Sequence, residues 1–94
     1  MDKNYIIHEI NNHLFTVKEY FLLVSIKLNN KDSELEYTIN SRIAIAYNNM
    51  KTSFELIKLL YPENKRGDVI NLELELFSRS VDINSYVLRM IAII

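Results

Sequence analysis

The only two histidines of the chain lie near its N-terminus and are the first candidates for metal chemistry. The segment HEINNH at residues 8–13 is one residue longer than the H-E-x-x-H helix motif of zinc proteases. Five residues of α-helix rotate a side chain by roughly 140°, so His8 and His13 diverge and cannot readily hold one ion. Glu9 and His13, four residues apart, are a typical surface pair on a helix. We therefore predict no metal site.

The residue types also give little support for a catalytic site of another kind, such as a cysteine nucleophile, a phosphate-binding loop or a carboxylate pair. The chain has no cysteine, which excludes disulfides, thiolate zinc sites and cysteine nucleophiles. Its single glycine cannot form a phosphate-binding loop. The glutamate pairs at 34/36 and 73/75 have a two-residue spacing, which turns the carboxylates to different faces of a helix. We predict a protein that is not an enzyme, with no catalytic residues and no cofactor.

Polar and aromatic side chains in the middle of the chain are candidates for ligand binding. Arg42 and Asn49 border an apolar stripe with Tyr47 nearby, and donors beside aromatic faces can bind a nucleotide or a peptide groove. The same side chains can instead form buried hydrogen bonds between packed helices. Both interpretations stay open, and these three residues are the predicted ligand-binding set.

The same stretch carries a short resemblance to a known family. Arg42-Ile43-Ala44-Ile45-Ala46, followed by Met50 and the run Thr52-Ser53-Phe54, looks like the central helix of phage anti-CBASS sponge proteins. The resemblance covers a small part of the chain. It implies a small helical oligomer that sequesters a cyclic nucleotide without hydrolysing it.

Composition and charge narrow the classes of partner. Eleven basic and twelve acidic residues give a net charge of −1 with no long block of either sign, so nucleic-acid binding is not expected. No apolar run approaches the length of about 20 residues that crosses a bilayer, and no secretory signal is recognisable. A cytoplasmic location is the default expectation. Abundant Asn and Ile with scarce Ala and Gly are typical of A+T-rich coding sequence, which suggests a bacterial or phage origin.

Two breaks divide what we predict to be a single domain over residues 1–94. Pro62 and Gly67 mark a loop over 61–68, and the polar run 29–34 marks another, where Asp32 or Ser33 could cap the next helix. Between the breaks, apolar residues recur every three or four positions, as on one face of a helix. The first stripe is Ile7, Ile10, Leu14, Val17, Phe21, Val24 and Leu28; the second is Leu35, Ile39, Ile43, Ala46, Met50, Phe54, Ile57 and Tyr61.

In the third segment, the spacing of apolar residues fits both a strand and a helix. Residues 70–76 alternate strictly between apolar and polar, as a half-buried strand would. A helical stripe also fits, and the leucines and glutamates favour a helix; we predict a helix with a break near residues 80–82. The members of this stripe are Val69, Leu72, Leu76, Ile83, Val87, Met90 and Ile94.

The predicted architecture is an all-α, up-down-up bundle of three long helices, with a fourth short C-terminal helix if the break forms. Residues 20–26 and 86–94 carry more apolar surface than one bundle face can bury, which favours association into a homo-oligomer. The predicted partner-binding residues are Phe21, Leu22, Ile26, Leu88, Ile91 and Ile93.

Three functions are compatible with these features. The first is a non-enzymatic protein-interaction module, such as an inhibitor, an immunity protein or an assembly subunit, that binds another protein or itself. The alternatives are a binder of a small ligand or cyclic nucleotide, and an accessory subunit of a nucleic-acid complex.

Overall fold

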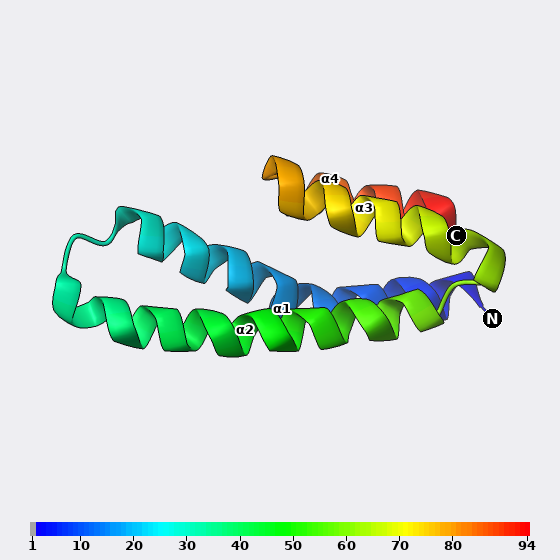
Figure 1. Cartoon of the computed structure of the whole chain (residues 1–94). Helices are drawn as coiled ribbons and strands as arrows, with labels where there is room; N and C mark the ends of the chain where they lie inside the picture. The colour runs from blue at the N-terminus through cyan, green and yellow to red at the C-terminus, as the bar shows by residue number, and fades with distance from the viewer. Residues whose placement is uncertain (1) are drawn as a thin grey trace.

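The computed structural model describes residues 2–94, and these are helical almost throughout. In chain order the elements are α1 (Lys3–Asn29), α2 (Ser33–Leu59), a short 3-10 turn η1 (Glu63–Lys65), α3 (Arg66–Arg79) and α4 (Ile83–Ile93). Figure 1 shows a long hairpin, α1 and α2, and a short hairpin, α3 and α4, that lies against one end of the long one. The predicted all-α class is confirmed for the described residues, and residues 70–76 are helical.

Aspartates cap three of the four α-helices at their N-termini. Asp2, Asp32 and Asp82 each accept a hydrogen bond from a backbone amide in the first turn of the following helix. At α2 the bond runs from the Glu34 amide to the Asp32 carboxylate and measures 2.9 Å. Such a bond satisfies an amide that has no partner within the helix and contributes about 1 kcal/mol. Of the two predicted caps for the second helix, Asp32 is the one that forms.

The predicted loop over residues 61–68 is shorter than expected. Pro62 directly precedes η1, and Gly67 is already the second residue of α3. The Arg66 Nε donates a hydrogen bond of 3.2 Å to the Tyr61 carbonyl, which holds the start of α3 against the end of α2.

Two short helices replace the third long helix that we predicted. α3 ends at Arg79, and Ser80 adopts φ 52° and ψ 45°, the left-handed conformation that commonly ends a helix. The chain then turns back, and the Arg89 guanidinium of α4 pairs with the Glu75 carboxylate of α3 through two hydrogen bonds of 2.8 and 2.5 Å. The expected break near residues 80–82 and the fourth short helix are therefore confirmed, whereas the predicted bundle of three long helices is wrong, because only α1 and α2 are long.

The hydrophobic core lies where the two hairpins overlap. Most members of the three predicted stripes that fall in this region are buried, with Ile6 buried in place of Ile7 at the start of α1 and Tyr86 as an additional member. The buried cluster consists of Ile6, Ile10, Val17, Met50, Phe54, Ile57, Tyr61, Val69, Leu72, Leu76, Tyr86, Val87 and Met90.

The short hairpin covers only part of the long one, so the molecule is a rod of 48 × 20 × 18 Å (Figure 1). Beyond the end of α3, α1 and α2 continue as a two-helix projection to the loop at residues 30–32. We call residues 22–45 the arm and the rest of the described chain the base. No residue between Lys18 and Ile45 is buried, so the arm has no core of its own.

Candidate interaction surface

The arm is rich in large apolar side chains, yet it buries none of them. Four are half-buried: Leu23, Val24, Ile39 and Ile43. Six others are exposed: Leu22, Ile26, Leu28, Leu35, Tyr37 and Ile45. Leu28 and Tyr37 each retain 80% of their accessible surface. Exposed apolar side chains in such number are typical of a surface that binds another protein.

The apolar stripes of the base continue into the arm without interruption. On α2, Ile39 and Ile43 precede Met50 and Phe54 on the same helical face. Met50 and Phe54 are fully buried because α3 and α4 cover that face, whereas Ile39 and Ile43 lie beyond the short hairpin. The arm therefore consists of two packed helices that no second pair of helices covers.

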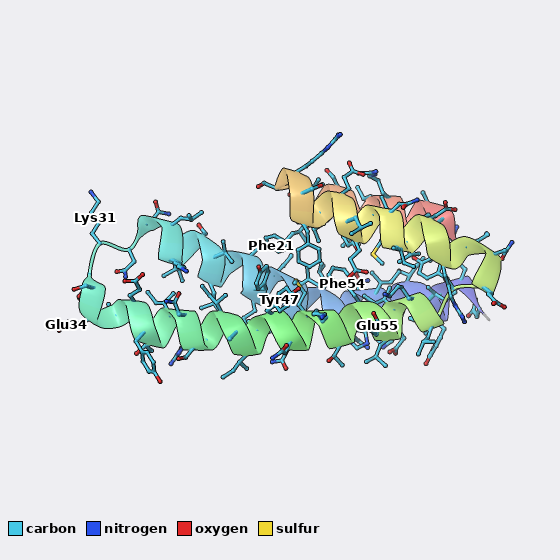
Figure 2. All side chains as sticks on the ribbon, in the orientation of Figure 1. Phe21, Lys31, Glu34, Tyr47, Phe54 and Glu55 are labelled. Atoms are coloured by element: carbon cyan, nitrogen blue, oxygen red, sulfur yellow. The ribbon has the colours of Figure 1, made fainter. Side chains whose placement is uncertain are left out.

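A cluster of aromatic rings marks the border between arm and base. Phe77, in the last turns of α3, lies 6.3 Å from the Tyr47 ring and 6.4 Å from the Phe21 ring, measured between ring centroids. Tyr20 bridges the two long helices, with its ring 5.6 Å from that of Tyr47. Figure 2 shows the side chains of Phe21, Tyr47 and Phe54 near the place where α3 ends over the long hairpin. Tyr47 and Phe77 remain 39% and 38% exposed, so the cluster presents partly open rings next to the arm.

Charged side chains differ at the two ends of the uncovered face. The tip of the arm carries charges of both signs: the exposed carboxylates of Glu34 and Glu36 in the first turn of α2, and the exposed lysines Lys27 and Lys31. At the border with the base, the Lys51 Nζ lies 5.5 Å from the centre of the Tyr47 ring, and Arg79 ends α3. Within residues 2–94, neither Lys51 nor Arg79 forms a salt bridge.

The structure separates the predicted partner-binding residues into two groups. Leu22, Ile26 and Leu88 are exposed, as a binding surface requires. The other three, Phe21, Ile91 and Ile93, are half-buried and pack against the core of the chain itself. Most of the apolar surplus that we assigned to residues 86–94 is thus used by the fold, while that of residues 20–26 continues onto the arm.

The predicted ligand-binding residues do not share a site. Arg42 lines a shallow hollow of about 210 Å³ with Glu19, Leu23, Ile45 and Ala46. Tyr47 instead faces the aromatic cluster, and Asn49 is exposed elsewhere on α2. Five residues of helix separate Arg42 from Tyr47, a rotation of roughly 140° that turns them to different faces. Glu19 also places a carboxylate in the hollow, which disfavours a phosphate there.

A second hollow lies at the opposite end of the molecule from the arm tip. It has a volume of about 280 Å³ and is lined by apolar side chains and the end of the chain: Ile6, Leu59, Leu60, Tyr61, Pro62 and Ile94. The Tyr61 hydroxyl donates a hydrogen bond of 2.7 Å to the Met90 carbonyl, which belongs to the last turn of α4. Burial raises the pKa of Tyr61 to about 12, so this tyrosine acts as a neutral structural donor.

Two other titratable side chains of the base, Tyr86 and Lys58, have a raised pKa. Burial raises the pKa of Tyr86 far above its usual range, and the nearby Glu73 carboxylate acts in the same direction. The Tyr86 hydroxyl is buried without a hydrogen-bond partner. A hydrogen bond from Lys58 to Glu55 is the main cause of a raised pKa at Lys58, and Glu73 on α3 contributes from 3.6 Å.

The described residues contain neither a metal-binding group nor a membrane-spanning helix. Within residues 2–94, no three carboxylate or histidine side chains come together in a group that could hold a metal ion. None of the helices in this range combines the length and the apolar character needed to cross a membrane.

Several exposed residues of the arm were not among our predicted contacts. Leu28 and Leu35 fit the helical stripes and were assigned to the core, and Tyr37 and Ile45 lie outside those stripes. The signal that could have identified Leu28 and Leu35 is their closeness to the loop at residues 30–32, where only two helices are in contact.

Comparison of the chain with protein-family models, curated protein sequences and solved structures finds no match.

Proposed function

We propose that this chain is a non-enzymatic protein-interaction module whose binding surface is the arm. The observation that carries the proposal is that ten large apolar side chains lie between residues 22 and 45 and none of them is buried. Two packed helices without a third neighbour gain little hydrophobic stabilisation, since most helical stability in proteins comes from tertiary packing. A partner that covers the arm would supply that missing packing.

The base then serves as the scaffold that orients the arm. It holds the entire core of the described chain, and two salt bridges tie its helices together, Lys58 to Glu73 and Arg89 to Glu75. An inhibitor, an immunity protein or an assembly subunit can work in this way, because each acts by occupying a surface and needs no chemistry of its own.

Site-specific photocrosslinking in the cell tests the proposal. A photoreactive phenylalanine analogue is placed at Leu28 or Tyr37 on the arm and, as a control that is also exposed, at Leu74 on α3. We expect discrete adducts, to another protein or to a second copy of the chain, from the two arm positions only. Equal crosslinking from Leu74, or no discrete adduct from the arm, would contradict the proposal.

A further inference from the structure

We propose that the arm docks onto the arm of a second copy of this chain, antiparallel to it, so that the two arms form a four-helix bundle. This inference rests on the proposed function and specifies the partner. The base shows which kind of element covers these stripes, because there a helical hairpin, α3 and α4, lies over α1 and α2 (Figure 1). The chain has one other helical hairpin with an uncovered apolar face, and that is the arm itself.

The lengths of the elements agree with this arrangement. At 1.5 Å per residue, α2 with 27 residues is about 40 Å long and α3 with 14 residues is about 21 Å long. The uncovered face therefore extends for about 20 Å. The part of α2 that lies in the arm, residues 33–45, has the same length of about 20 Å. An arm consequently fills the space that a second copy leaves uncovered, and the relation is reciprocal, as in a two-fold dimer.

An antiparallel register pairs the apolar residues of α2. With the two-fold axis between Ile39 and Ile43, Ile39 of one copy lies opposite Ile43 of the second copy. The same register places Leu35 opposite Tyr47 of the second copy, beside the open aromatic cluster. On α1, Leu28 then approaches Phe21 of the second copy. Leu28, Leu35, Ile39 and Ile43 thereby each gain an apolar neighbour.

Charge and helix direction favour the same orientation. α3 runs antiparallel to α2, so the α2 helix of an antiparallel second copy continues in the direction of α3 beyond Ser80. Its positive N-terminal end then follows the negative C-terminal end of α3. Glu34 in its first turn then lies opposite Asn48, close to Arg79 at the end of α3, and Arg79 has no salt-bridge partner within residues 2–94. This register therefore pairs Glu34 with Arg79 of the second copy, and it also brings Lys31 opposite Lys51.

The size of the face indicates the affinity. Two helices side by side, each about 10 Å wide, cover about 400 Å² per copy over a length of 20 Å, or about 800 Å² in total. Stable complexes usually bury more than about 1,200 Å². We therefore expect a reversible dimer with a dissociation constant in the micromolar range, and no larger species because a two-fold interface is closed.

Sedimentation equilibrium of the purified full chain, from about 1 µM to about 1 mM, measures this association. We expect the mass to rise from monomer to dimer and to stop there. Leu28→Glu should weaken the dimer at least tenfold, whereas the control Leu74→Glu should leave it unchanged, since Leu74 is exposed on the outer face of α3. Circular dichroism confirms that both variants keep their helices. A strictly monomeric chain, or equal weakening by both substitutions, would overturn the inference.

A charge exchange tests the orientation. Glu34→Arg and Arg79→Glu should each weaken self-association about tenfold, because each homodimer then brings like charges together. An equimolar mixture of the two variants should associate as tightly as the natural chain, since every contact is again between opposite charges. No recovery in the mixture would rule out the antiparallel register. A monomer whose arm still crosslinks to a different protein would end this inference and leave the proposed function intact.

Discussion

The arm and the base are built from the same two helices, yet they differ in how those helices are covered. Met50 and Phe54 in the base are fully buried, whereas Ile39 and Ile43, on the same face of α2, remain half-buried in the arm. The difference arises from the second layer, because α3 and α4 cover only one end of the long hairpin (Figure 1). An amphipathic stripe thus shows which side of a helix needs a neighbour but not whether the chain itself provides one.

The largest change in the free energy of unfolding is expected for a core residue of the base, and a much smaller one for an exposed residue of the arm. Phe54→Ala should lower the free energy of unfolding by about 3 to 5 kcal/mol, because it removes a fully buried ring that contacts Phe77 and Tyr86. Leu28→Ala should change it by less than about 0.5 kcal/mol, since Leu28 is 80% exposed. Urea unfolding of dilute, monomeric protein followed by circular dichroism measures both. Similar losses for the two variants would erase the distinction between arm and base.

Alkaline pH should weaken the base through its buried tyrosines. The pKa of Tyr61 is raised from 10.0 to about 12 in the folded chain, so the unfolded chain loses this proton first as the pH rises. The stabilisation is complete below pH 10 and is lost between pH 10 and pH 12, by about 1.4 kcal/mol at pH 11 from Tyr61. Tyr86, whose pKa is also raised, acts in the same direction. The double variant Tyr61→Phe/Tyr86→Phe should show a flatter decline in urea unfolding between pH 9 and pH 11, and an equally steep decline would contradict this assignment.

The same two tyrosines should respond differently when they are replaced singly at neutral pH. Tyr61→Phe removes the hydrogen bond to the Met90 carbonyl and should cost about 1 kcal/mol. Tyr86→Phe removes a buried hydroxyl that has no partner, and should leave the stability unchanged or increase it. Thermal unfolding of the Tyr61→Phe and Tyr86→Phe variants measures both changes in stability. A loss for Tyr86→Phe as large as that for Tyr61→Phe would show that the Tyr86 hydroxyl does find a partner.

The smallest expected effect is a gain in the short hairpin. Ser80 is the only described non-glycine residue with a positive φ, a conformation that glycine adopts without the steric cost of a Cβ. Ser80→Gly should therefore raise the free energy of unfolding by up to about 1 kcal/mol, detectable in urea unfolding. A destabilised variant would mean that the Ser80 side chain has a role beyond the turn.

The sequence allowed the helices to be predicted because their apolar spacing is regular and their breaks carry strong signals. Asp32, Pro62 and the weak periodicity near Ser80 each mark a real boundary. The position of the short hairpin along the long one was not predictable, since it depends on packing between segments far apart in the chain. For that reason Leu28 and Leu35 were expected in the core, although they are exposed.

The candidate site was predictable only in part, for a related reason. Leu22 and Ile26 were identified from an apolar surplus that local spacing reveals, and both are exposed on the arm. Ile91 and Ile93 belong to a similar surplus, but the return of α4 against α3 buries much of it. The sequence alone does not distinguish an apolar run that the fold covers from one that it leaves for a partner.

Hydrogen exchange resolved by residue tests most directly whether the arm lacks packing of its own and obtains it from a second copy, as we propose. At low protein concentration the amides of residues 22–45 should exchange orders of magnitude faster than those of the core helices in the base. At high concentration the arm amides should become protected while the base is unchanged. Equal protection of arm and base at every concentration would contradict the claim, because the arm would then be stable without a partner.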